Sequence, residues 1–149
     1  MIKTSSIYLI VKDFEKSLAF YKSLFEKDVD AQNMDRFAMF FINGFCLAIN
    51  NAYFDERNPD KVEIKGKYDK EYDNLIGIAQ SDNSGKVVIN LETDDLVKEH
   101  RRLLKGKVGE NITSIKYVNA GTPYYYFSLK DPDGNTIEIT GLYDGEVEE

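Results

Sequence analysis

The spacing of apolar residues near the start of the chain predicts a strand followed by a helix. Residues 6–11 form an apolar run of the length that β-strands favour. Apolar side chains then recur at helical spacing, at Phe14, Leu18, Tyr21 and Phe25. Asp13 precedes them, and aspartate is a residue type that caps helix N-termini by accepting a backbone hydrogen bond. This opening segment therefore predicts a strand and an amphipathic helix.

The same order of signals occurs a second time in the chain. Residues 87–92 have the pattern of another strand, and Asp95 follows them as Asp13 follows the first strand. The expected apolar face of the second helix consists of Leu96, His100, Leu103 and Leu104. The strand-helix unit is therefore an internal repeat.

Each repeat is followed by a predicted hairpin. Residues 37–42 and 45–49 flank Asn43-Gly44, a dipeptide suited to the positive φ angles of a type I′ turn. Residues 124–130 and 135–142 flank Asp131-Pro132-Asp133-Gly134, in which the proline favours a turn. Residues 29–32 and 112–118 supply the remaining strand of each half. Each half is therefore expected to have the order βαβββ.

The charged stretch between the two halves predicts how the single domain is organised. From Asp55 to Asn74 the chain is dense in charge and has no sustained apolar period, which favours an exposed insertion. Its aromatic residues leave open a lid over a cavity mouth or a contact with a second subunit. We expect a first module at about residues 1–50, an insertion at 51–85, a second module at 86–143 and an acidic tail at 144–149.

Composition excludes several classes of partner. Nineteen basic and 26 acidic residues give a net charge of -7, which repels nucleic acid and anionic lipid. The apolar run at residues 7–11 is far shorter than the roughly 20 residues of a membrane span, so we expect a cytoplasmic protein. Cys46 is the only cysteine and lies in an apolar run, which predicts a core or pocket-wall residue rather than a nucleophile.

Three segments resemble one known family. Residues 6–13 with 17–21 resemble the opening of the vicinal oxygen chelate superfamily, which includes glyoxalase I, extradiol dioxygenases and bleomycin-resistance proteins. Residues 127–139 resemble its closing hairpin, and 91–95 extend the match. The resemblance implies an α+β fold. Its two βαβββ modules form a half-open curled sheet around a cavity, with helices on the outer face and dimerisation completing the site.

Alternation along the predicted strands indicates which side chains would face that cavity. In the closing hairpin Phe127, Leu129, Ile137 and Ile139 share the apolar face that helices cover, and the other face is polar. The same parity applied to all strands gives the candidate ligand-binding residues, which are Ser6, Tyr8, Ala48, Val88, Asn90, Tyr124, Tyr126 and Glu138.

The resemblance also implies four positions for the ligands of a divalent metal. In catalytic members His, Gln or Glu side chains from four strands bind the metal, and these positions fall at Ser6, Ala48, Val88 and Glu138. Only Glu138 suits a metal, and the single histidine, His100, is expected to be partly buried in the second helix. We therefore predict no metal and no other cofactor, leaving at most a weak Mg²⁺ or Ca²⁺ site at Glu138.

Several functions fit this pattern. The main hypothesis is a metal-independent small-molecule-binding protein resembling bleomycin-resistance proteins, dimeric, with a neutral or cationic and partly aromatic ligand. The tyrosines at 124–126 could instead simply fill a small barrel. An alternative is an enzyme of the glyoxalase or dioxygenase family, a lyase or isomerase, with a degenerate metal site or with Glu138 as general base and a tyrosine as acid. A third is an interaction module that uses residues 51–85 as its contact surface.

Overall fold

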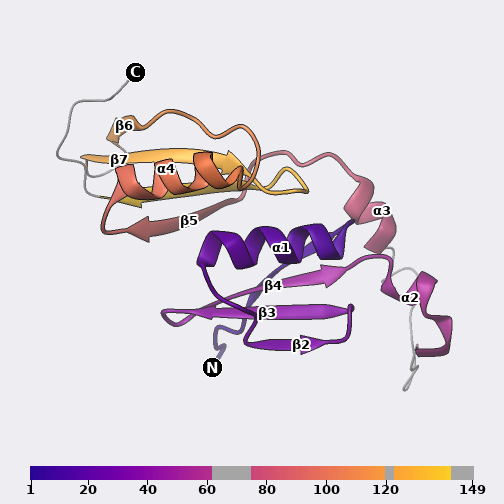
Figure 1. Ribbon diagram of the computed structural model, residues 1–149. Coiled ribbons are helices and arrows are strands. Elements are labelled where there is room, and N and C mark those ends of the chain that lie inside the picture. The colour runs from indigo at the N-terminus through magenta and orange to yellow at the C-terminus, as the bar shows by residue number, and fades with distance from the viewer. Residues whose placement is uncertain (62–74, 120–122, 142–149) are drawn as a thin grey trace. The chain divides into compact units, whose positions relative to one another are not determined.

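The structure is a computed structural model that describes residues 1–61, 75–119 and 123–141 (Figure 1). The chain divides into two compact units, Met1–Asp82 and Asn83–Glu149, called unit 1 and unit 2 below. Each unit contains one four-stranded mixed sheet and the helix that follows its first strand.

Unit 1 begins with the predicted strand and helix. Its elements are β1 (Ile7–Val11), α1 (Phe14–Phe25), β2 (Ala31–Asn33), β3 (Phe37–Ile42), β4 (Phe45–Asn51), α2 (Phe54–Arg57), the 3₁₀ helix η1 (Pro59–Lys61) and α3 (Leu75–Gln80). The strand order is β1-β4-β3-β2, with β1 parallel to β4 and the other neighbours antiparallel. The strand expected at residues 29–32 is thus a three-residue edge strand that starts slightly later.

Unit 2 repeats this topology. Its elements are β5 (Val88–Thr93), α4 (Leu96–Gly106), β6 (Lys116–Asn119), β7 (Pro123–Lys130) and β8 (Thr136–Gly141), in the sheet order β5-β8-β7-β6. The predicted α+β fold with two βαβββ modules is therefore confirmed. The strand expected from residue 112 begins only at Lys116, although a bridge between Glu110 and Lys130 continues the pairing further back.

Each of the two long helices is capped at its N-terminus by the aspartate that precedes it. The Asp13 carboxylate accepts from the Lys16 backbone N–H at 3.1 Å, and Asp95 accepts from that of Lys98 at 3.0 Å. Each such cap is worth about 1 kcal/mol of stability. No helix in the described part of the chain combines the length and apolarity needed to span a membrane.

Both hairpin turns form where the sequence predicts them. Asn43 and Gly44 have positive φ angles of 47° and 80°, and Ile42 pairs with Phe45 across them, as a type I′ turn requires. In the second turn the buried Asp131 carboxylate accepts from the backbone N–H groups of Asp133 and Asn135 at 2.9 and 2.8 Å. These local bonds fix the register of β7 and β8.

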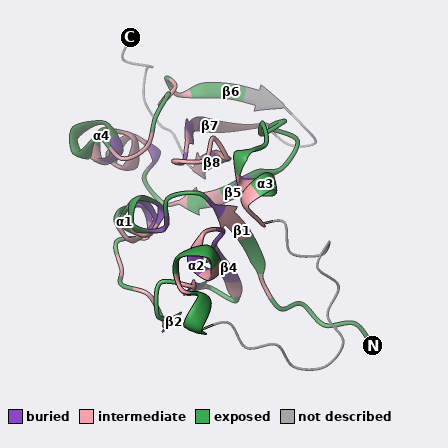
Figure 2. Ribbon diagram, turned by 90° about the vertical axis from the view of Figure 1, so that its right-hand side faces the viewer, coloured by how far each residue is buried: buried purple, intermediate pink, exposed green. Residues whose placement is uncertain are grey.

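The core of unit 1 lies between α1 and its sheet (Figure 2). Tyr21 is fully buried, and its ring lies 6.4 Å from that of Phe40 on β3. The predicted helix face was partly wrong, because Leu18 and Phe25 are only half-buried whereas Ser17, Phe20 and Leu24 are buried. The buried stripe therefore follows positions 14, 17, 21 and 24. The small side chain at Ser17 allows the helix to lie close to the sheet.

The core of unit 2 lies on the predicted face of its sheet. Its side chains are almost fully buried, and they are Phe127, Leu129, Ile137 and Ile139 from the hairpin and Leu96 and Leu103 from α4. Leu104 was expected in this core but is 48% exposed, because Leu96 and Leu103, two turns apart, define a narrower stripe. His100 is half-buried as predicted, with Nε2 at 2.8 Å from the Thr113 carbonyl oxygen and its ring against Phe127.

The beginning of the predicted exposed insertion is buried. Ala52 and Phe54 are only 6% and 3% exposed, and α3 lies against β1 in the same unit. The expectation of an exposed segment is therefore wrong for these residues. Residues 62–74, which carry much of its charge, lie outside the described residues.

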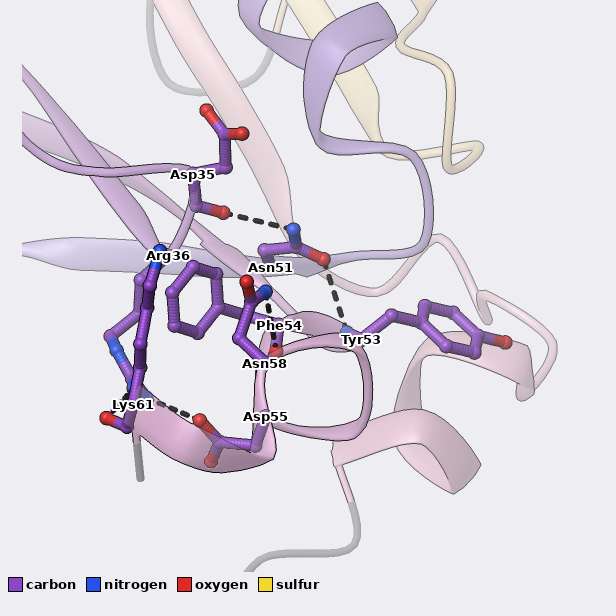
Figure 3. A network of polar contacts seen from close by, with 8 residues as sticks. All are labelled: Asp35, Arg36, Asn51, Tyr53, Phe54, Asp55, Asn58 and Lys61. Atoms are coloured by element: carbon purple, nitrogen blue, oxygen red, sulfur yellow. Dashed lines mark hydrogen bonds and ion pairs between the residues drawn. The ribbon is translucent and has the colours of Figure 1, made fainter. Parts of the chain in front are cut away.

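Long-range polar contacts explain this burial (Figure 3). The Asn51 side chain donates to the Asp35 carbonyl at 2.8 Å and accepts from the Tyr53 backbone N–H at 3.0 Å. The Arg36 guanidinium lies 4.3 Å above the Phe54 ring centroid and forms an ion pair with Asp55 at 2.6 Å. These contacts attach the turn after β4 to the β2–β3 connection.

Candidate functional site

The polar side chains of unit 2 gather on the face of its sheet opposite the core. Because Phe127, Leu129, Ile137 and Ile139 face the other way, strand alternation places the remaining side chains together. We call this set the polar face of unit 2, and it consists of Val88, Asn90, Glu92, Lys116, Tyr124, Tyr126, Ser128, Lys130, Thr136, Glu138 and Thr140. It contains every candidate residue that the sequence assigned to this half of the chain.

Glu138 lies in the middle of the polar face of unit 2. On β8 it pairs with Asn90 of β5 on one side and Ser128 of β7 on the other. The Asn90 side-chain amide donates to Glu138 Oε1 at 2.8 Å. Sequence parity predicted the shared face, and the hydrogen bond shows that Asn90 holds the carboxylate in place.

Two tyrosines from β7 complete this group. The rings of Tyr124 and Tyr126 lie 6.0 Å apart at an angle of 55°, and both side chains are half-buried. Burial raises the pKa of Tyr124, and the nearby Glu138 carboxylate, Tyr126 and a hydrogen bond to Glu138 raise it further. The Tyr124 hydroxyl is therefore a neutral donor at physiological pH.

The other members of the polar face of unit 2 are less specialised. Val88 is 46% exposed at the start of β5. The Thr140 hydroxyl donates to the Leu91 carbonyl at 3.1 Å, so this bond joins β8 to β5 within the sheet. The chemistry of this face is therefore concentrated at Glu138, Asn90 and the two tyrosines.

The corresponding face of unit 1 is apolar. It lies opposite the face that packs on α1, and we call it the apolar face of unit 1, defined by Tyr8, Ile10, Phe37, Met39, Phe41, Cys46 and Ala48. The polar residue Asn50 shares this face. Tyr8 and Phe41 are each 51% exposed, and the Tyr8 ring meets Phe37 edge-on at 6.1 Å. Ala48, between Tyr8 and Met39 in the register, is fully buried, and Ser6 is half-buried just before β1.

Phe37 and Met39 were not among the candidate residues. The signal was present in the sequence, because both share the parity of Phe41 on β3. Their register partners Asn50 and Ala48 place them beside the residues that were named. Extending the parity argument to β3 would have found them.

A surface pocket of unit 1 lies apart from all the candidate residues. Its volume is about 330 Å³, and its lining residues are Lys12, Asp13, Phe14, Glu15, Asp35, Asn51 and Arg57. Charges of both signs line it, at the start of α1 and beside the contacts of Figure 3. No pattern along the chain predicts this pocket, because its lining residues come from three separate connections.

Cys46 is buried, as its apolar neighbours predicted. Burial raises the pKa of its thiol, and the negative charge of Asp30 raises it further. A thiol that stays protonated is a poor nucleophile, so Cys46 belongs to the packing of β4.

A family model matches most of this architecture. The model is that of the Glyoxalase/Bleomycin resistance protein/Dioxygenase superfamily, and it covers residues 3–139. The chain therefore belongs to this superfamily. No curated protein matches the chain.

Solved structures of the superfamily share the fold at low sequence identity. A glyoxalase-related enzyme from Fulvimarina pelagi is 18% identical with a TM-score of 0.58, covering 100% of this chain and 96% of that one. A lactoylglutathione lyase from Agrobacterium tumefaciens is 15% identical with a TM-score of 0.57, covering 95% and 92%. The fosfomycin resistance protein FosX from Mesorhizobium loti is 16% identical with a TM-score of 0.56, covering 96% and 95%. Such identities show the fold alone.

Superfamily membership implies a divalent metal, and the donor set tests whether this chain fits one. The four expected positions carry a hydroxyl at Ser6, a methyl at Ala48, an isopropyl group at Val88 and a carboxylate at Glu138. Within the described ranges, no three His, Cys, Asp or Glu side chains cluster in a way that could hold a metal ion. Because dedicated transition-metal sites use three or four such donors, these residues do not fit the group.

Proposed function

We propose that this chain is a metal-independent small-molecule-binding protein, similar in function to bleomycin-resistance proteins, whose ligand is neutral or cationic and partly aromatic. One observation carries the proposal. Glu138, where the superfamily resemblance places a metal ligand, accepts a hydrogen bond from Asn90 and adjoins the half-buried Tyr124 and Tyr126, without the other donors that a metal requires. A carboxylate held in this way suits recognition of an organic ligand.

The apolar face of unit 1 is a second candidate surface for an aromatic group. Tyr8 and Phe41 expose half of their side chains, and exposed aromatic surface of this kind is frequent at binding sites. Flat rings offer stacking area at a low cost in conformational entropy. We therefore propose Ser6, Tyr8 and Ala48 in unit 1 and Val88, Asn90, Tyr124, Tyr126 and Glu138 in unit 2 as ligand-binding positions.

Thermal-shift screening tests this proposal. The library should contain aromatic compounds of each charge class, measured with the metal-free protein. A ligand at a hundredfold its dissociation constant adds about 2.7 kcal/mol of stability, which gives a clear rise in melting temperature. If no compound of any charge class stabilises the protein, the tyrosines serve only as packing and the proposal is wrong.

A second candidate function is catalysis with Glu138 as general base. The placement of Tyr124 and Glu138 on one face of adjacent strands favours it, because a proton donor lies near a proton acceptor. Such a pair suits isomerisation next to a carbonyl group. Deuterium exchange at carbons adjacent to the carbonyl, followed by NMR over a ketone panel, would detect it. Activity that survives Glu138→Gln would exclude Glu138 as the base.

We also propose a homodimer, as the superfamily resemblance implies. Sedimentation equilibrium should then return twice the chain mass of 17.1 kDa. A single species at the chain mass, at concentrations where ligand binds, would exclude this assembly. The cytoplasmic location and the four-part division of the chain stay predictions.

A further inference from the structure

We infer that the polar face of unit 2 binds an organic ammonium group of the ligand, held by the Glu138 carboxylate and the rings of Tyr124 and Tyr126. This inference rests on the proposed binding function and specifies the chemistry of one part of the ligand.

The charge of Glu138 is fixed in position but not neutralised. Asn90 donates to Oε1 at 2.8 Å, and this amide donor is neutral. Lys116 and Lys130 share this face by the strand register, and Lys130 donates to the Thr136 hydroxyl. Among the described residues, no lysine or arginine forms an ion pair with Glu138. A half-buried carboxylate without a cationic partner favours a positively charged ligand group.

Acceptor capacity remains for that ligand group. An ionised carboxylate offers about four lone-pair sites, of which Asn90 uses one. An ammonium group carries up to three N–H donors and fits the remaining sites. Charge-assisted hydrogen bonds of this type are roughly twice as strong as those between neutral groups.

The two tyrosines add a second attraction for a cation. Their rings lie 6.0 Å apart at 55°, so they are not stacked and their faces remain inclined to each other. The negative face of an aromatic ring attracts ammonium groups within about 6 Å of its centre. An anionic ligand would instead meet the repulsion of Glu138 and of the net charge of -7.

Three probes of one shape and different charge test the inference. Benzylammonium, benzyl alcohol and benzoate are titrated into the full-length protein by isothermal calorimetry, with ¹⁵N NMR locating the perturbed amides. We expect benzylammonium to bind at least about tenfold more tightly than benzyl alcohol, since hydrogen bonds to charged groups are the stronger class. Benzoate should bind most weakly, and the shifted amides should include Asn90 and Glu138.

Two matched variants separate the specific carboxylate from general charge. Glu138→Gln preserves the shape of the side chain and should remove the preference for benzylammonium over benzyl alcohol. Glu56→Gln makes the same charge change at an exposed position on α2 in unit 1, and should change the affinity by less than about twofold because water screens it. Equal losses in both variants would attribute the preference to overall charge and would overturn the inference.

The remaining outcomes are also decisive. If benzyl alcohol or benzoate binds as tightly as benzylammonium, or if benzylammonium does not bind, the ammonium site is wrong. The proposed binding function would still stand in that case if the wider thermal-shift library yields ligands. Both ideas fail together only if that library yields none.

Discussion

The two units share one topology but present different chemistry on the sheet face away from the helix. Ile7 pairs with Leu47 in unit 1 as Ile89 pairs with Ile137 in unit 2, so the following pairs, Tyr8–Ala48 and Asn90–Glu138, occupy equivalent places. One place holds a phenol beside a buried methyl group, and the other holds an amide bonded to a carboxylate. The repeat therefore preserves the framework and varies the chemistry.

The helix-facing positions show what the framework requires. Leu47 and Ile137 are equivalent and both fully buried, and the next inward residues, Ile49 and Ile139, are also buried. Both helices also begin at an aspartate cap. Apolar burial and capping thus fix the fold in each unit, and the opposite face is free to differ between them.

The largest expected effect comes from transferring the carboxylate to the equivalent place in unit 1. Ala48 is fully buried, and its register neighbours are Tyr8 and Met39. Neither has a side-chain amide like that of Asn90, which donates a hydrogen bond to Glu138. Ala48→Glu should cost about 3–5 kcal/mol of unfolding free energy, because it buries a charge without a partner. Chemical denaturation measures this cost, and Ala48→Gln controls for side-chain size. Equal stability of Ala48→Glu and wild type at neutral pH would show that this place tolerates charge.

Truncating the equivalent core residues should give matched losses. Leu47→Ala and Ile137→Ala each remove a fully buried aliphatic side chain, so each should cost about 2–5 kcal/mol. Denaturation monitored by circular dichroism compares the two variants. A large loss in one and none in the other would mean that the two cores do not contribute alike.

Removing the caps should have a smaller and equal effect. Asp13→Ala and Asp95→Ala each delete one carboxylate bond to a helix N-terminus, and each should cost about 1 kcal/mol. Asp→Asn at the same positions keeps an acceptor oxygen and serves as the control. Asparagine variants as unstable as the alanine variants would point to charge, not hydrogen bonding, as the source of the effect.

The smallest expected effect concerns alkaline pH and is confined to unit 2. The pKa of Tyr124 is raised in the folded state, so the folded protein keeps a proton that the unfolded chain releases once the pH exceeds about 10. The free energy of unfolding should therefore fall as pH rises through that range, and Tyr124→Phe should reduce this fall. Ultraviolet titration of tyrosinate should lose its highest-titrating component in the variant. The same titration curve in both proteins would contradict the raised pKa.

Much of the fold follows from local rules that act within a few residues. Asp13 and Asp95 cap the next turn, Asn43-Gly44 adopts positive φ angles, and strand alternation separates Phe127 from Ser128. These features need no knowledge of distant contacts, and all were predicted. The helix face was harder, because its buried stripe includes Ser17, a polar residue that an apolar pattern does not mark.

The features that were not predicted depend on long-range pairs. Phe54 is buried because Arg36, a residue distant from it in the sequence, lies over its ring and forms an ion pair with Asp55. Parity likewise placed Asn90 and Glu138 on one face, but their hydrogen bond required the register of β5 and β8. Neither the burial of Phe54 nor the orientation of the carboxylate could be obtained from patterns along the chain.

Because the Cys46 thiol is buried, its reaction with an alkylating reagent reports local unfolding of the sheet that contains it. It is the only cysteine in the sequence, and it lies on β4 in unit 1. An alkylating reagent should modify it only when that sheet opens, so the labelling rate measures the dynamics of one half of the protein without any engineered probe. Unit 2 contains no cysteine, so the same experiment does not label it.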